Sequence, residues 1–170
     1  MGVEQTIRER FSVRSYRPDP VSEADLMAVL ESARLSQSAK NLQDWRFVVV
    51  RNESTRKKLA EAAKGQRFVA EAPVVIACCG FDTGYVMTCG QKSYVIDVAI
   101  AIENMALTAH ERGLGTCWLG AFYEDQAKSV LGISSPEVRV VGLITLGYSA
   151  ATAPGQKRKP IGDVVAFERW

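Results

Sequence analysis

Near the start of the chain, in residues 10–14, basic and hydroxyl side chains alternate with apolar ones. In an extended backbone, successive side chains point to opposite sides, so the polar residues share one side and the apolar residues share the other. Guanidinium groups present forked donors that suit a phosphate, and a serine hydroxyl adds another. The segment is a candidate anion site, with a solvated basic edge as the alternative. Its polar residues are Arg10, Ser12 and Arg14.

A polar loop further along the chain offers a different kind of contact. Ser38, Asn41 and Gln43 stand directly before the aromatic and β-branched run of residues 45–50. Carboxamides both donate and accept hydrogen bonds, which suits the imide edge of a heterocycle. Such residues also form ordinary turns, so the loop alone leaves both interpretations open.

A basic run near the C-terminus, residues 156–160, begins with Gln156 and continues Lys157, Arg158, Lys159. A solvated linker often has this composition. The sharper hypothesis is a basic tail that closes over a phosphate, because lysine and arginine both bind phosphate oxygens.

Other catalytic and cofactor motifs find little support in the sequence. Residues 113–115 begin like a G-x-G dinucleotide motif, but they follow a predicted helix and enter a strand, the reverse of the required order. His110 is the only histidine, and it leaves no convincing pair of nucleophile and base. We therefore expect no catalytic side chain of the triad type.

The four cysteines, at positions 78, 79, 89 and 117, lack the C-x-x-C spacing of zinc sites. As neighbours in a predicted strand, Cys78 and Cys79 would point to opposite faces, out of reach of one metal ion. We expect no metal and four reduced thiols in a cytoplasmic protein. A redox sensor working through Cys78, Cys79 or Cys117 stays a further hypothesis, although apolar surroundings usually make thiols inert.

Apolar periodicity and turn residues predict the elements that must position these groups. The helix over 94–112 is apolar nearly all round, so we expect it to be central to the fold or to a dimer interface. The final residues, 161–170, carry two aromatic and several β-branched side chains, and they must dock on their own domain or on a partner. Helices are predicted over 3–10, 23–34, 52–63, 66–71, 94–112 and 123–131, and strands over 45–50, 74–79, 115–120 and 138–147.

Length and composition describe one globular domain. The chain has 170 residues, of which 47% are apolar and 24% charged, enough for a core and too apolar for disorder. Its formal charge of +2 argues against nucleic-acid binding through a basic field. No apolar run approaches the roughly 18 residues of a membrane span, and no signal pattern precedes the first helix, so we expect a cytoplasmic protein.

Four motifs, met in order along nearly the whole chain, resemble those of the FMN-dependent nitroreductase family. One motif alone would be weak, but four in order and spacing are specific. The chain is short for this family, so it resembles a minimal member. The motifs are Arg10-x-Ser12-x-Arg14-Ser15-Tyr16-Arg17, Ser38-Ala39-x-Asn41-Leu42-Gln43-x-Trp45, Gly113-Leu114-Gly115-Thr116-Cys117-Trp118-Leu119-Gly120 and Arg158-Lys159-Pro160.

The resemblance implies an α+β fold, a mostly antiparallel sheet flanked by helices, as one FMN-binding domain over residues 1–170. It also implies a homodimer in which residues 160–170 pack on the partner subunit, with residues 164–167 as a strand exchanged into the partner's sheet. FMN would lie at the dimer interface and contact both chains.

By the same resemblance, the basic residues would hold one end of FMN. Arg10 and Ser12 would bind the phosphate and ribityl end, and Arg14 would approach the N1/O2 side of the ring, where a positive charge stabilises the reduced flavin. Arg158 would bind the phosphate from the tail. Lys157 is a candidate second partner, because Gln156 stands where the family often has a lysine.

The remaining cofactor residues would contact the flavin ring. Asn41 and Gln43 would meet its pyrimidine edge, with Ser38 nearby. A strand end would pass beside the ring and offer a backbone N–H to N5 or O4; its residues are Trp118, Leu119 and Gly120. Lys40 and Asp44 depart from the family pattern at the mouth of the pocket, which leaves the charge preference for substrates open.

The resemblance further implies an oxidoreductase in which FMN carries the chemistry. In a ping-pong cycle, NAD(P)H would deliver hydride to flavin N5, and an electron-poor small molecule such as a nitroaromatic or a quinone would take the electrons. Dehalogenation, enone reduction and flavin breakdown in other branches of the family remain alternatives. A flavin-binding protein for storage or sensing, without turnover, is another.

Overall fold

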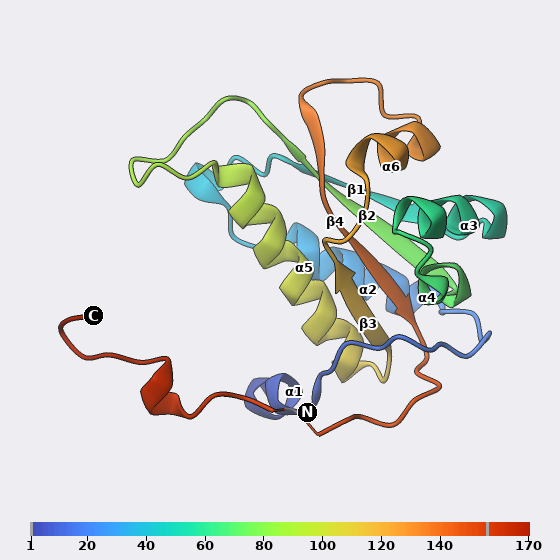
Figure 1. The fold of residues 1–170 in the computed structure, drawn as a ribbon, viewed down its shortest axis with the longest axis horizontal. Helices are drawn as coiled ribbons and strands as arrows, with labels where there is room; N and C mark the ends of the chain where they lie inside the picture. Colours follow the sequence, from blue (N-terminus) through green and yellow to red (C-terminus); the bar gives the residue numbers. More distant parts are fainter. Residues whose placement is uncertain (1, 156) are drawn as a thin grey trace.

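A four-stranded antiparallel sheet in the order β1-β2-β4-β3 forms the centre of the molecule (Figure 1). The computed structural model describes residues 2–155 and 157–170. All four expected strands are confirmed, and β2 continues to Phe81 instead of ending at residue 79. The strands are β1 (Trp45–Val50), β2 (Val74–Phe81), β3 (Gly115–Leu119) and β4 (Val138–Gly147).

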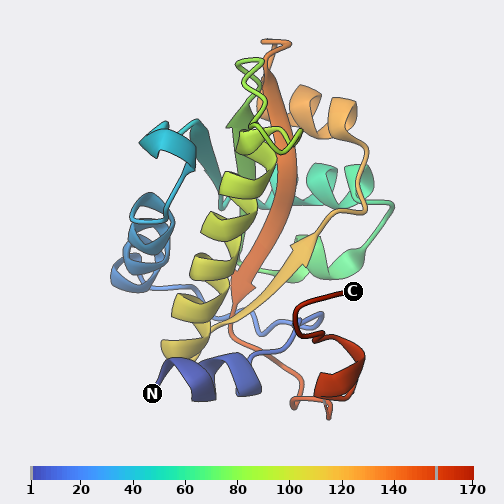
Figure 2. The ribbon, with the colours of Figure 1, turned by 90° about the vertical axis from the view of Figure 1, so that its left-hand side faces the viewer.

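Helices cover both faces of this sheet, which confirms the expected α+β class. Figure 2 shows α2 and α5 on one face and α3, α4 and α6 on the other. Helix α1 lies against α5 near the chain terminus. The helices are α1 (Val3–Glu9), α2 (Glu23–Arg34), α3 (Glu53–Ala62), α4 (Arg67–Glu71), α5 (Ser93–Glu111) and α6 (Glu124–Leu131), with short 3-10 turns η1 (Ala39–Asn41) and η2 (Ile161–Asp163).

Side-chain caps mark where helices α2 and α3 begin. The Ser22 side chain accepts a hydrogen bond from the backbone N–H of Asp25 at 3.1 Å, so α2 starts with the expected N-cap. The Asn52 side chain does the same for α3, accepting from the N–H of Thr55 at 3.0 Å. Both caps supply acceptors for N–H groups that the first turn of a helix leaves without partners.

Alternation along β2 divides the interior into two cores. Cys78 points into the core beneath α2 and α5, whereas Cys79 points into the core beneath α3, α4 and α6. This confirms that the two neighbouring thiols face opposite sides of the sheet. Over residues 2–155 and 157–170, no group of three or more His, Cys, Asp or Glu side chains could hold a metal ion.

Helix α5 is buried along one side only, which differs from the expected burial all round. Val98, Ile102 and Met105 are buried against the sheet and α2, but Val95 and Ile96 are 43% and 40% exposed. The reason is geometric, because one sheet and one neighbouring helix cannot enclose a whole helix. Among the described residues, no helix is both long and apolar enough to cross a bilayer.

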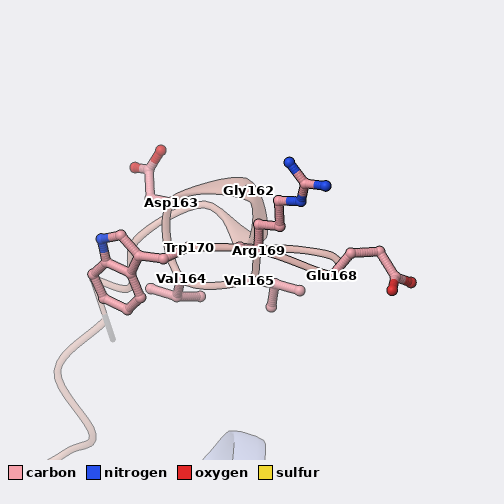
Figure 3. A pocket seen from close by; sticks show the side chains of 8 residues that line it. Gly162, Asp163, Val164, Val165, Glu168, Arg169 and Trp170 are labelled. Atoms are coloured by element: carbon pink, nitrogen blue, oxygen red, sulfur yellow. The ribbon is translucent and has the colours of Figure 1, made fainter.

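The C-terminal tail, residues 161–170, runs away from the body of the domain (Figure 1). Its apolar side chains are exposed, and Phe167 reaches 85%. In this single chain, residues 164–167 form no strand and follow the η2 turn. Figure 3 shows Val164, Val165 and Trp170 around a hollow of about 620 Å³ that only tail residues line. An exposed apolar segment of this kind is typical of a surface that another chain covers.

The buried thiols should resist alkylation at pH 8. Burial raises the pKa of Cys79 to about 11 and that of Cys78 well above its usual range. Burial also raises the pKa of Cys117, although the nearby Arg14 opposes this effect. Thiolates at these positions are therefore scarce, and iodoacetamide should modify only the exposed Cys89 quickly, as mass spectrometry of timed samples would show.

A Cys89→Ser variant provides the control, because it should lose the fast reaction altogether. Reaction at a buried thiol as fast as at Cys89 would contradict this expectation and would favour the redox-sensor hypothesis.

Candidate functional site

The segment with Arg10, Ser12 and Arg14 lies against the edge of β3. Ser12 pairs in parallel with Thr116, and the N–H of Val13 donates to the carbonyl oxygen of Thr116 at 2.8 Å. Val13 is buried, and a Cβ on Gly115 would lie only 2.5 Å from its Cγ2 atom. The glycine thus lets Val13 enter the core, and the alternation then directs the three polar side chains outward, as predicted.

A buried hydroxyl pair locks this segment to the sheet. The Tyr16 hydroxyl donates to the carbonyl oxygen of Val13 at 3.0 Å and lies 2.7 Å from Oγ1 of Thr145 in β4. Thr145 Oγ1 in turn accepts from the N–H of Cys117 at 3.2 Å. Burial raises the pKa of Tyr16 above its ordinary value, so the phenol keeps its proton at neutral pH. The hydrogen bonds of the Tyr16 hydroxyl on the buried side of the segment therefore fix the backbone that carries the arginines.

The segment after α1 and the segment after β4 meet in a basic cavity of about 240 Å³. The extended segment after α1 forms one wall, and the segment that leaves β4 forms the other. Gln156 lies outside the described residues, but its neighbours in the basic run take part. The polar residues lining this cavity are Arg10, Ser12, Arg14, Lys157 and Arg158. The structure thus brings together the basic residues and the serine that were expected to surround one end of FMN.

A second cavity, of about 340 Å³, adjoins the first and shares Arg10 and Ser12 with it. Small and apolar side chains of α5 form one wall, and Trp118 of β3, which is 54% exposed, forms part of another. Arg10 and Glu103, which both line this cavity, form an ion pair, with Arg10 Nε 3.7 Å from Glu103 Oε1. The α5 residues lining the cavity are Ala99, Ile102, Glu103 and Ala106.

Gly142 of β4 makes room for the Trp118 indole. A Cβ at position 142 would overlap Trp118 Nε1 and would lie 3.2 Å from Cδ1 of Ile102 in α5. The indole therefore crosses the backbone of β4 at a position without a side chain. This contact holds the aromatic face at the edge of the second cavity.

The other two residues of the Trp118 motif can contribute only backbone groups or space. Leu119 is buried in the core on the opposite face of the sheet, beneath α3 and α6. Gly120 is exposed, directly after the end of β3. The alternation along β3 explains this split, because Trp118 and Leu119 are neighbours in a strand.

The carboxamide loop around η1 is an irregular turn near the N-terminal half of α5. Ser38 Oγ accepts from the N–H of Gln43 at 3.1 Å, and Gln43 Nε2 donates to the carbonyl oxygen of Asn41 at 3.3 Å. The backbone has positive φ at Lys40, Asn41 and Gln43, with values of 52°, 56° and 55°. The Lys40 ammonium lies 4.5 Å from the centroid of the Tyr85 ring. The three predicted side chains thus share one turn.

One chain alone does not bring this loop to the basic cavity. The loop meets α5 at Asp97, whereas the arginine segment meets it at Glu103. These two positions differ by about 120° around the helix and ~9 Å along it. Neither of the two cavities has Ser38, Asn41 or Gln43 in its lining. The predicted site residues of the loop and of the arginine segment therefore form two separate groups on different sides of α5.

Comparison with known proteins agrees with this architecture. The family model described as the nitroreductase family matches residues 7–73 and 62–148. A protein of Methanothermobacter thermautotrophicus, with the provisional name NADH dehydrogenase/NAD(P)H nitroreductase, is 33% identical over all of this chain and 88% of its own length. An NADH dehydrogenase of Thermus thermophilus is 31% identical, covering 94% of this chain and 92% of that protein.

A solved structure shows the same fold. The crystal structure of a nitroreductase family protein from Clostridium difficile 630 superimposes with a TM-score of 0.89 at 25% identity, covering 100% of this chain and 99% of the other. With the family match and the relatives above, the chain belongs to the nitroreductase family. It is an oxidoreductase of the nitroreductase type, and the resemblance in its four motifs is confirmed at the level of the family.

Sequence reasoning missed three residues that position the site. The sequence gives Tyr16 no pattern that points to a partner in β4, and Gly142 gives no signal in a strand of apolar residues. Asp97 carried a usable signal, because an acidic residue stands among the apolar positions of a long helix. It is buried, and its Oδ1 accepts from the N–H of Ala39 at 3.0 Å.

Replacing Gly142 by alanine should displace the Trp118 indole. The added Cβ overlaps the indole nitrogen, so the side chain must leave its position, and overpacking of this kind costs about 1–3 kcal/mol in free energy of unfolding. Thermal unfolding would report the loss of stability, and tryptophan fluorescence would report the altered environment. A Gly120→Ala variant is the control, because a Cβ there stays 3.5 Å from the same ring. Equal behaviour of the two variants would contradict the packing described.

Proposed function

We propose that this chain is an FMN-dependent oxidoreductase that takes hydride from NAD(P)H and reduces an electron-poor small molecule, such as a nitroaromatic or a quinone. The observation that carries the proposal is the convergence of two segments distant in the sequence, residues 10–14 and 154–158, on one basic cavity that adjoins a cavity edged by Trp118. Relatives support it by name, including an FMN reductase [NAD(P)H] of Bacillus subtilis that is 25% identical over 93% of this chain and 70% of that protein.

The residues present fit a phosphorylated planar cofactor. The basic cavity is lined by cationic groups and a hydroxyl, and these groups favour a phosphate over a neutral ligand. The adjoining cavity is lined by Ala99, Ile102 and Ala106 of α5 and by the Trp118 indole, apolar surfaces that suit an aromatic ring, and Glu103 adds one charged group. Arg10 and Ser12 line both cavities, so they would lie where the phosphate-bearing chain joins the ring system.

The protein's part in the reaction is to bind, orient and set charge. When bound, FMN would supply the two-electron chemistry in a ping-pong cycle, accepting hydride at N5 and passing electrons to the second substrate. Arg14 lines the basic cavity and not the adjoining one in the single chain. The family resemblance would place its positive charge beside the N1/O2 side of the ring, where negative charge develops. Ser38, Asn41 and Gln43 would hold the pyrimidine edge, and backbone N–H groups of residues 118–120 would offer hydrogen bonds beside the ring.

A second copy of the chain would complete the site. The loop with Ser38, Asn41 and Gln43 lies on the other flank of α5 from the arginines, so two chains could supply the two groups. The exposed apolar flank with Val95 and Ile96 provides a surface for such contact. The tail supports the same arrangement, because residues 164–167 would add to the partner's sheet and cover their exposed side chains.

The first test is flavin binding with an Arg14→Ala variant. Wild-type protein should bind FMN, turn yellow and bleach when NAD(P)H is added. Loss of the guanidinium should weaken FMN binding about tenfold or more, since a charge-assisted hydrogen bond contributes about 1.5–3 kcal/mol. Titration by quenching of flavin fluorescence measures the affinity.

Arg17→Ala is the matched control, because Arg17 lies on the same segment but pairs with Asp19 at 3.2 Å and does not line the basic cavity. A colourless protein that takes up no FMN would overturn the cofactor assignment. Bound FMN that NAD(P)H cannot reduce would favour a storage or sensing role instead.

A second test addresses the tail. The variant Val165→Asp with Phe167→Asp places charges on two apolar side chains that we expect to be buried against a second copy. It should shift the protein from dimer to monomer in light scattering, and it should lower FMN affinity. Glu168→Gln, in the same tail, should leave both unchanged. A variant that stays dimeric with wild-type affinity would show that the tail has no part in assembly.

A further inference from the structure

The loop that carries Ser38, Asn41 and Gln43 needs an external support. Left-handed backbone is unfavourable for residues that have a Cβ, yet three residues of this short loop adopt it. Two backbone hydrogen bonds close the turn itself, from the N–H of Asn41 to Ser38 and from the N–H of Leu42 to Ala39, both at 3.0 Å. The two side-chain hydrogen bonds within the loop join exposed groups, at 3.1 and 3.3 Å. Bonds of this kind compete with water, so they do not by themselves fix one conformation.

Asp97 of α5 is the buried group beneath this loop. Asp97 is only 3% exposed. Its Oδ1 accepts a hydrogen bond from the backbone N–H of Ala39, the first residue of η1. Its Oδ2 is also buried, and no donor within residues 2–155 and 157–170 reaches it. Burying a carboxyl group that makes only one hydrogen bond, to a backbone N–H, lowers the stability of the fold, because the group loses its contacts with water. An apolar residue would suit the stability of α5 better, so the position of Asp97 indicates a role in the loop.

A second contact from the same helix holds the start of the loop. Asn104 Nδ2 donates to Ser36 Oγ at 2.7 Å. Asn104 lies about two turns after Asp97, so both side chains leave the same face of α5. Helix α5 thus makes two hydrogen bonds to the connection between α2 and β1. The bond from Asp97 lies next to the residues proposed to contact the flavin ring.

We propose that Asp97 is the positioning residue that holds the loop of residues 38–43 in its left-handed conformation, so that its hydroxyl and carboxamides are preorganised for the flavin ring. This role rests on the proposed function of FMN binding. It is a matter of geometry: Asp97 acts through the N–H of Ala39 and touches neither the substrate nor the reacting atoms.

Three variants of the full-length protein test this role. Asp97→Ala removes the acceptor. Asp97→Asn keeps an acceptor oxygen in the same place without the charge. Ser93→Ala is the control, because Ser93 is equally buried in the first turn of α5 and has no hydrogen bond to the loop among those described. Two quantities are measured: amide hydrogen exchange at Ala39 without FMN, by NMR, and FMN affinity by fluorescence quenching.

With Asp97→Ala, exchange at Ala39 should speed up and FMN should bind more weakly, each by about tenfold or more. Asp97→Asn should restore both values to near wild type, and Ser93→Ala should change neither. If Asp97→Ala fails to fold, slow exchange and wild-type affinity in Asp97→Asn still support the role, and their loss overturns it.

Two outcomes separate this role from the proposed function. Wild-type protein that binds no FMN overturns the proposed function. Wild-type protein that binds FMN, together with a folded Asp97→Ala variant of equal affinity and unchanged exchange, overturns the role of Asp97 alone.

Discussion

The site depends on the way residues 12–16 are held against the sheet. The bond from Val13 to Thr116 places this segment beside β3, and the buried hydroxyls of Tyr16 and Thr145 fix it to β4. A buried hydroxyl without a partner costs about 1–3 kcal/mol, so this pair favours a single register. A shift by one residue would expose Val13 and turn the arginines inward. The convergence of positive charge on the surface therefore originates in a neutral, buried contact.

Helix α5 links the parts of the site to one another. One side packs on the sheet, the next forms the wall of the apolar cavity, and a third holds the loop of residues 36–43 through Asp97 and Asn104. Because these groups share one rigid element, their spacing follows from helical geometry. The same helix also has apolar side chains, Val95 and Ile96, that are exposed in the single chain. The packing of one domain therefore does not account for all of its apolar residues.

The sequence predicts much of this fold, because the longer helices and the strands have a clear apolar period and helices α2 and α3 also begin at a recognisable N-cap. The two-sided alternation of residues 10–14 also predicts correctly which side chains face outward. The packing of Trp118 across Gly142 could not be predicted, since it joins different strands and leaves no local pattern. The separation of the carboxamide loop from the arginines could not be predicted either. It depends on which sides of α5 the two segments contact, and the sequence pattern does not give these positions. The exposure of Val95 and Ile96 shows a similar limit: periodicity identifies an apolar face without saying which chain covers it.

The order of segments after β4 has a thermodynamic consequence. Lys157 and Arg158 line the basic cavity, and the apolar tail follows them within a few residues. If the tail docks on a second chain, as proposed, ordering either segment reduces the entropy cost of ordering the other. Ligand affinity and self-association then become linked functions that must strengthen each other by the same factor. Diluting the protein alone would lower its apparent affinity for the cofactor, and saturating it with the cofactor would favour self-association.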